Sequence, residues 1–285
     1  MLDENPLLDN YHQAPVIGYH RAPLSQKFGA PRQPNLVALT SVIEMLAPYD
    51  TPAAFDGLDK FSHIWVSWQF HYNYRYKNNN ETSTSFRAQV RPPRLGGNQK
   101  IGVFASRSMY RPSGLGLSVV KLEQVKIVQG RVLLIIEGAE MIDGTPIIDI
   151  KPYVAYSDAL IQTENGFAPT APELLTVTVT DAANEQFMML VSAGQPSDVN
   201  NNDTSIKDAN TGSNSTAVAS TIHRIQNQLV ASDMSIIKEL IAQDPRPAYR
   251  RTEIATPFIM RYKSADVSFQ LIESGQLQII AVVTV

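Results

Sequence analysis

The sequence of 285 residues contains no cysteine. This absence excludes disulfide frameworks, thiolate metal sites, iron–sulfur clusters and cysteine nucleophiles. Long apolar runs are also missing, since runs such as 132–136 and 279–283 fall far short of the ~20 residues of a membrane-spanning helix. Residues 1–15 are acidic and lack the apolar stretch of a secretory signal, so they form an N-terminal extension. We therefore expect a cytoplasmic protein with no membrane segment.

Several catalytic and cofactor motifs are absent as well. The histidines do not show the HExxH spacing of a helical zinc site, and a metal site is not expected. The sequence has no GxSxG nucleophile elbow, no Walker loop and no complete GxGxxG after a strand. The GLG at 114–116 lacks the third glycine, which disfavours a Rossmann cofactor domain.

Charge is concentrated in one part of the chain. The formal net charge is -3, yet residues 87–126 carry eight basic side chains against Glu123 alone, a net of +7. A local field of this kind suits a partner that presents phosphates at a defined place, although a solvated basic loop is an equal alternative.

Hydrophobic residues make up 44% of the chain, enough to form a packed core. Short apolar runs rich in β-branched and aromatic residues predict a mainly β protein. The strand candidates are 61–70 (FSHIWVSWQF), 100–105 (KIGVFA) and 131–137 (RVLLIIE). The dipeptide Asp143-Gly144 predicts a tight hairpin turn, whereas 34–46 fits either a short helix or a strand.

The second half of the chain changes character twice. Residues 161–191 are expected to form a connector with a strand and a short helix. Residues 192–221, which follow, are dominated by Asn, Ser, Thr, Asp and Gly, and this composition predicts a flexible linker insertion. Apolar residues at helical spacing then predict a helical pair over 222–241, ended by the proline-rich segment that begins at Asp244. Two strands joined at Ser274-Gly275 follow, so 222–285 is expected to form a small α+β C-terminal domain.

Three polar segments place arginine beside proline: PRQP at 31–34, VRPPRLGGNQK at 90–100 and ASRSMYRPSGLG at 105–116. Proline restricts the backbone, so a neighbouring arginine loses less entropy when it binds an anion or stacks on a base. Each segment alone also fits an ordinary proline-rich turn.

Further segments can be set beside these, namely IGYHRAPLSQKFGAPRQPNL, GLDKFSHIWVSWQFH, DGTPIIDIKPY and the late QDPRPAYR. Together, in this order and spacing, they resemble the TrmO (TsaA-like) family of S-adenosylmethionine-dependent tRNA methyltransferases. The resemblance covers roughly residues 16–160 and 222–270. It implies a single-sheet β-barrel methyltransferase domain over 16–160, a homodimer with the active site near the subunit interface, and methyl transfer to N6 of threonylcarbamoyladenosine, 3′ of the anticodon of threonine tRNA.

The same resemblance implies a set of S-adenosylmethionine contacts. They map onto Arg32, Gln33, Pro34, Phe70, His71, Arg107, Leu117, Gly138, Ala139 and Glu140. The loop RPSGLG departs from the family's usual Arg-Pro-Asn-Pro-Ile-Gly, so only Arg111 and Pro112 match there and the loop should be less rigid.

The acceptor nitrogen of this modified adenosine belongs to a urea, and its proton must be removed or its developing charge stabilised. The catalytic candidates are His71 and Asp149; each also fits a packing or pairing role, Asp149 with Lys151. Contacts to the threonylcarbamoyl carboxylate and to the anticodon loop are expected from Arg91, Arg94, Tyr110, Arg111, Arg246, Tyr249, Arg250 and Arg251. Two alternatives remain: a methyltransferase for a small molecule, and a non-catalytic RNA-binding β-barrel.

Overall fold

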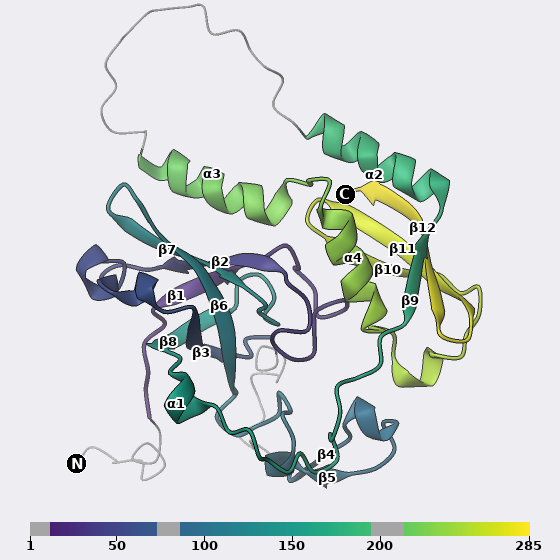
Figure 1. Ribbon diagram of the computed structural model, residues 1–285, viewed down its shortest axis with the longest axis horizontal. Helices are drawn as coiled ribbons and strands as arrows, with labels where there is room; N and C mark the ends of the chain where they lie inside the picture. Colours follow the sequence, from purple (N-terminus) through teal and green to yellow (C-terminus); the bar gives the residue numbers. More distant parts are fainter. Residues whose placement is uncertain (1–11, 73–85, 195–213) are drawn as a thin grey trace, which may run out of the picture.

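The computed structural model describes residues 12–72, 86–194 and 214–285. Figure 1 shows a barrel on the left, a second sheet on the right, and a small lobe below them that contains β4 and β5. Helix α3 lies above the barrel, whereas α2 and α4 lie beside the second sheet (Figure 1). In the described part of the chain, the helices are too short or too polar to cross a membrane.

Six antiparallel strands close the barrel in the order β1-β2-β7-β6-β3-β8. They are β1 (Gly18–Arg21), β2 (Thr40–Met45), β3 (His63–Gln69), β6 (Leu115–Val128), β7 (Arg131–Glu137) and β8 (Pro146–Pro152). In β3 the side chains of Ile64, Val66 and Trp68 are buried and alternate with partly exposed ones, as expected of strands with one face on a core. The expected mainly β, single-sheet barrel is thus confirmed.

The second sheet has the order β10-β11-β12-β9, in which β9 is parallel to β12. Its strands are β9 (Thr176–Val179), β10 (Phe258–Tyr262), β11 (Ala265–Glu273) and β12 (Gln276–Thr284). Helices α2 (Asp181–Ala193) and α4 (Asp233–Ala242) share a core with it. Because β9 and α2 belong to this packing, the C-terminal unit extends beyond the expected 222–285.

The two units also contact each other directly. Leu24, Val37 and Leu39, from the segments around β1 and β2, are buried in the core of the C-terminal unit. In the opposite sense, helix α3 (Asn214–Asn227) buries Val218 and Ile222 against the barrel strands β2 and β7. Each unit therefore supplies apolar side chains to the other.

Small elements complete the chain. They are β4 (Gln89–Val90), β5 (Ile101–Gly102), α1 (Ala155–Asp158) and the 3-10 turns Pro52–Phe55, Leu58–Lys60, Pro93–Leu95, Val103–Ala105 and Ala248–Arg250. The strand expected over 100–105 is thus a two-residue strand followed by a 3-10 turn. The alternative left open at 34–46 is resolved as strand β2.

Two other expectations need correction. A turn does form at Asp143-Gly144, with Gly144 at a φ of 74°, but β7 and β8 on either side of it are not neighbours, because β8 pairs with β1 and β3. The insertion expected over 192–221 ends earlier, since α3 begins at Asn214; its residues 195–213 lie outside the described part.

Candidate functional site

The PRQP loop packs against the end of strand β7. The backbone N–H of Asn35 donates to the Gly138 carbonyl at 2.8 Å, and the Asn35 Nδ2 donates to the carbonyl of Val119 in β6 at 3.0 Å. Gly138 has a φ of 85°, and a Cβ there would come within 2.5 Å of Asn35 Oδ1. A glycine is therefore required where the loop meets the barrel.

A hydrogen-bonded chain links the barrel interior to the residue after this junction. Trp68 Nε1 donates to Ser118 Oγ at 2.8 Å, and Ser118 Oγ donates to Glu140 Oε1 at 2.6 Å. The ring of Phe70 packs edge-on against Trp68, with 4.2 Å between ring centroids. The end of β3, the start of β6 and the segment 138–140 thus converge, which brings Phe70 and Glu140 into one region.

Glu140 is a buried carboxyl in this cluster. Burial raises the pKa of Glu140, while the hydrogen bond from Ser118 and the positive charge of Arg107 oppose that rise. Its Oε2 atom is buried without a hydrogen-bond partner, and the same is true of Gln33 Oε1 in the PRQP loop. Buried polar atoms are normally paired, so these two oxygens are suited to hydrogen-bond donors from a ligand. Because the resemblance implies cofactor contacts for Gln33, Phe70, Arg107, Gly138 and Glu140, we call these residues the cofactor cluster.

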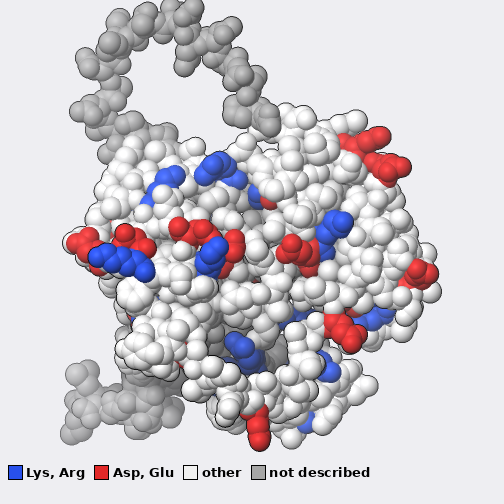
Figure 2. Space-filling model, viewed as in Figure 1, with Lys and Arg blue, Asp and Glu red and all other residues white. Residues whose placement is uncertain are grey.

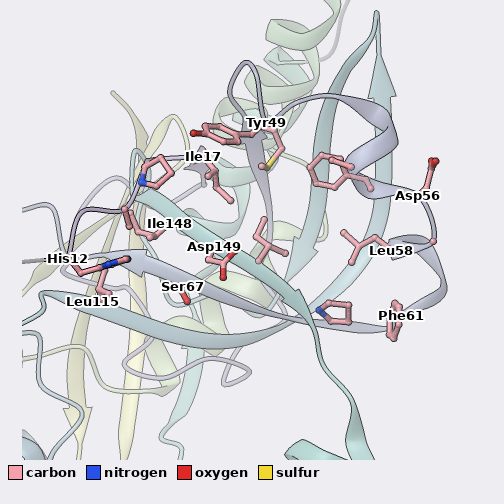
Figure 3. A pocket seen from close by; sticks show the side chains of 18 residues that line it. His12, Ile17, Tyr49, Asp56, Leu58, Phe61, Ser67, Leu115, Ile148 and Asp149 are labelled. Carbon is pink, nitrogen blue, oxygen red and sulfur yellow. The ribbon is translucent and has the colours of Figure 1, made fainter.

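Leu117 and Asp149 lie on the outer face of the barrel. Ser67 of β3 is the register partner of both, so the three residues lie side by side across three strands. Leu117 is 52% exposed. Figure 3 shows Asp149 and Ser67 in the wall of an open pocket of about 930 Å³ that is lined mostly by apolar residues, Tyr49, Leu58 and Phe61 among them.

The two catalytic candidates thus occupy different places. His71 directly follows Phe70, and its ring centroid lies 4.3 Å from that of Tyr72. Asp149 is exposed, and the ion pairs among the described residues do not include the Asp149–Lys151 pair considered from the sequence. No three His, Asp or Glu side chains in the described ranges gather as metal ligands would.

The part of the basic segment that precedes β6 forms the lower lobe around β4 and β5, whereas Lys121 and Lys126 lie on β6 of the barrel. Arg94 donates to the backbone carbonyl of Thr170, and Arg111 Nη1 donates to the carbonyl of Ser106 at 3.0 Å. Arg91 and Tyr110 are exposed. Figure 2 shows Lys and Arg side chains around the recessed area below the centre of the molecule.

The C-terminal motif QDPRPAYR has an interior and an exterior part. Arg246 is 1% exposed and donates to both carboxylate oxygens of Asp244, at 2.8 and 3.3 Å. Arg251 also pairs with Asp244, at 3.1 Å. Arg250 pairs with Glu253 at 2.7 Å, whereas Tyr249 is 85% exposed. Tyr249 is thus available to a large partner at the surface, and Arg246 supports the motif from within.

The same motif touches the PRQP loop. Arg32 Nη2 donates to the Asp244 carbonyl at 3.5 Å, and Gln243 Nε2 donates to the Leu36 carbonyl at 3.3 Å. Burial and the nearby Arg251 charge lower the pKa of Arg32. The C-terminal unit therefore holds the loop that carries Gln33 and Pro34.

Some residues of the site were missed from the sequence. Trp68 and Ser118 connect Glu140 to the barrel, and Asn35 fixes the PRQP loop. Strand alternation alone places Trp68 and Ser118 on inward faces. Their contact depends on the register of β3 against β6, which the sequence does not reveal.

Comparison with known proteins matches both units. A family model described as tRNA-methyltransferase O N-terminal domain matches residues 19–159, and the TrmO C-terminal domain model matches residues 214–285. The tRNA (adenine(37)-N6)-methyltransferase of Escherichia coli (strain K12) is 32% identical over 265 residues, covering 90% of this chain and 94% of that protein.

Two further similarities extend over nearly the same length. A protein of Pseudomonas aeruginosa (strain PAO1), described as putative S-adenosylmethionine-dependent methyltransferase RcsF, is 34% identical over 90% of this chain and 91% of its own. The crystal structure of TrmO from Pseudomonas aeruginosa superposes with a TM-score of 0.66 at 27% identity, covering 96% of this chain and 98% of that one.

The closed barrel, the arginine–proline loop at its rim and the fused α+β unit define a two-part β-barrel protein, distinct from the Rossmann-type cofactor proteins. Both parts match models of one family over most of the chain. The chain belongs to the TrmO family, and the resemblance seen in the sequence is confirmed.

Proposed function

We propose that this protein transfers a methyl group from S-adenosylmethionine to N6 of adenosine 37 in tRNA, and that its substrate is the threonylcarbamoyl-modified adenosine of threonine tRNA. The observation that carries the proposal is the cofactor cluster: the PRQP loop is hydrogen-bonded to the segment 138–140, that segment is linked to the end of β3 through Ser118, and the loop and the segment each contain one buried oxygen without a hydrogen-bond partner. The names of the relatives support the adenosine 37 reaction.

The donor set of the cluster fits S-adenosylmethionine. This cofactor carries an amino-acid ammonium, ribose hydroxyls and an adenine amino group, which are the hydrogen-bond donors that Gln33 Oε1 and Glu140 Oε2 lack. Arg32 and Arg107 supply cations for its carboxylate. Pro34 and Leu117 would pack against its apolar surface, with Phe70 and His71 at the adenine. When bound, the sulfonium supplies an activated methyl group.

The chain's own task is to orient the acceptor and to handle one proton. N6 of the modified adenosine loses a proton as the new N–C bond forms, and an enclosed site that holds the reacting atoms in line supplies much of the rate. His71 adjoins the cofactor cluster, and Asp149 lies on the neighbouring outer face. Either side chain can accept this proton, and the acceptor must be unprotonated to do so. The pH profiles of His71→Asn and Asp149→Asn therefore distinguish them: removal of the acceptor should greatly lower the rate and abolish the rise of rate with pH on the acidic side of the profile.

The threonylcarbamoyl group adds a carboxylate to the substrate. Arg91, Arg94 and Arg111 are the candidates to bind it, because a guanidinium can hold a carboxylate with two parallel hydrogen bonds. Arg94 already bonds Thr170, and Arg111 bonds Ser106, so Arg91 is the member of this set that we place first. In the C-terminal unit, Tyr249, Arg250 and Arg251 would contact the tRNA, with Arg246 supporting them from within.

We also propose that the active form is a homodimer whose partner approaches the site. The open apolar pocket and the exposed Leu115 and Leu117 on the outer face of the barrel support this arrangement. The test is sedimentation of the full chain: a dimer is expected, and a monomer that methylates tRNA at full rate would contradict the arrangement.

The substrate is tested with labelled S-adenosylmethionine and two preparations of threonine tRNA, one with and one without the threonylcarbamoyl group. Label is expected only in the modified tRNA. Equal incorporation into both would refute the threonylcarbamoyl assignment while leaving the adenosine 37 reaction in place. Label in a small molecule alone, or tRNA binding without any transfer, would favour the two alternatives considered from the sequence.

A further inference from the structure

Three large aromatic side chains are exposed on the basic lower lobe. Phe86 is 57% exposed, Phe104 67% and Tyr110 45%. The strand pair β4–β5 at the lower end of Figure 1 joins the segment that contains Phe86 to the turns that contain Phe104 and Tyr110. None of the three belongs to a core cluster of the described residues, so packing of the chain does not account for them.

The rings and two arginines form a connected patch. The ring centroids of Phe86 and Phe104 are 6.0 Å apart with a 31° tilt. The Arg87 guanidinium lies 4.5 Å from the Tyr110 ring centroid, and that of Arg111 lies 5.9 Å from the Phe104 centroid. We call Phe86, Arg87, Phe104, Tyr110 and Arg111 the aromatic–arginine patch.

The turn that carries the patch is held in place by short-range hydrogen bonds. Ser106 Oγ donates to the Val103 carbonyl at 2.8 Å and accepts from the Ser108 N–H at 3.3 Å, while Tyr110 N–H donates to Ser108 Oγ at 3.1 Å. Arg111 closes the turn through its bond to the Ser106 carbonyl. The rings are thus held in place before a partner binds. Less conformational entropy is then lost on binding, which favours the complex.

The charge around the patch has one sign. Residues 86–111 contain six basic side chains and no acidic one; the six are Arg87, Arg91, Arg94, Lys100, Arg107 and Arg111. Flat rings beside guanidinium groups, in a segment whose only charges are positive, match a partner that is both planar and anionic. Unpaired nucleotides have this chemistry, since their bases stack on aromatic rings and their phosphates pair with arginine.

The patch also borders the cofactor cluster. The Phe70 N–H of the cluster donates to the Gly114 carbonyl at 2.9 Å, and the Gly114 N–H donates to the carbonyl of Arg111 in the patch at 2.9 Å. An acceptor adenosine placed beside the cofactor would therefore bring its neighbours along the strand to the patch. We propose that the aromatic–arginine patch is a stacking platform for unpaired bases of the anticodon loop next to the adenosine that is methylated. This inference rests on the proposed tRNA substrate.

The test measures the binding of full-length protein to an unmethylated anticodon stem-loop. Phe104→Ala and Phe86→Ala are expected to weaken binding by about 10-fold each, the usual effect of removing one base-stacking ring. The slope of affinity against salt concentration should stay unchanged in both, because no charge is lost. Arg87→Gln should weaken binding and reduce that slope by about 1. The matched control is Tyr156→Ala, which removes a ring that is 94% exposed on α1.

A second arm identifies the bases. Stem-loops with an abasic nucleotide at each loop position in turn should show one position at which Phe104→Ala has no further effect. The inference is overturned if Phe104→Ala and Phe86→Ala bind as tightly as Tyr156→Ala. It is also overturned if they alter sedimentation instead, which would make the patch a contact between copies of the chain. If the wild-type protein binds no stem-loop but binds S-adenosylmethionine, the proposed tRNA substrate fails instead.

Discussion

At the scale of single residues, the buried carboxyl of Glu140 is the most informative group. It accepts from Ser118 through one oxygen and leaves the other without a partner. An ionised carboxylate in such a place costs folding free energy, and this cost is consistent with a role in binding a cationic donor. Function and stability should therefore oppose each other at this position.

Replacing this acid by its amide separates the two effects. Burial raises the pKa of Glu140 above its usual 4.5. The native protein therefore holds this proton more tightly than the unfolded chain does. This difference stabilises the fold fully below pH 4.5, and the stabilisation is lost as the pH rises through the pKa of the native protein. Glu140→Gln keeps the acceptor for Ser118, and at pH 8 its melting temperature should equal or exceed that of the wild type. Its affinity for S-adenosylmethionine should fall by about 10-fold, as expected for a lost charged hydrogen bond. Calorimetry of unfolding and of binding measures both; a less stable variant with unchanged affinity contradicts the role.

His20 is a second buried titratable group, located in the barrel wall. Its Nδ1–H donates to the Ile142 carbonyl at 3.2 Å, so Nε2 accepts from Ser41 at 2.8 Å and the ring is neutral. Burial lowers the pKa of His20 to about 4. The unfolded chain therefore binds this proton at a higher pH than the native protein does.

Linkage gives the direction of the pH effect. Between pH 6.5 and about 4 the free energy of unfolding should fall, by an amount on the order of 3 kcal/mol from this group alone. His20→Gln, which cannot titrate, should be less stable at pH 7.5 but lose less stability on acidification. Urea unfolding at both pH values checks this. If the two proteins lose stability in parallel, His20 is not the group responsible.

At the scale of elements, the sequence predicts where a strand lies along the chain better than which strands it pairs with in the sheet. The run 131–137 became β7 with the same bounds, because an apolar β-branched stretch fits a sheet wherever it pairs. The turn at Asp143-Gly144 formed, but its local chemistry could not specify that β8 pairs with β1 and β3. Likewise, the sequence predicts the PRQP loop, whereas the contacts of Arg32 with Asp244 and of Leu36 with Gln243 depend on tertiary packing.

The bracing of the PRQP loop by the C-terminal unit leads to a prediction about cofactor binding. Gln243→Met removes the hydrogen bond to the Leu36 carbonyl with little change in volume. The loop should then be held less firmly, and S-adenosylmethionine affinity should weaken by about 3- to 10-fold, the usual range for one hydrogen bond. Calorimetric titration of the full chain measures this change.

The control uses a similar side chain elsewhere in the same unit. Gln228 Nε2 donates to the Gly194 carbonyl at 3.4 Å, away from the loop. Gln228→Met should leave cofactor affinity at the wild-type value with a comparable change in melting temperature. Equal affinities for the two variants would show that the C-terminal unit does not position the loop.

At the scale of the whole molecule, the protein combines an acidic net charge with one basic region. The net charge is -3, while residues 86–111 carry six cations and no anion. The barrel supplies the cofactor cluster, the lower lobe supplies cations and rings, and the C-terminal unit braces the PRQP loop and exposes Tyr249. The central claim is that these parts act on one tRNA nucleotide.

The most direct test of that claim locates the transferred methyl group. The purified full chain is incubated with isotopically labelled S-adenosylmethionine and tRNA that carries no methyl group at adenosine 37, and nucleosides and loop fragments are analysed by mass spectrometry. The label is expected on N6 of the adenosine at position 37 and nowhere else in the tRNA. Label at another position or atom, or none in tRNA while the protein binds the donor, would contradict the account.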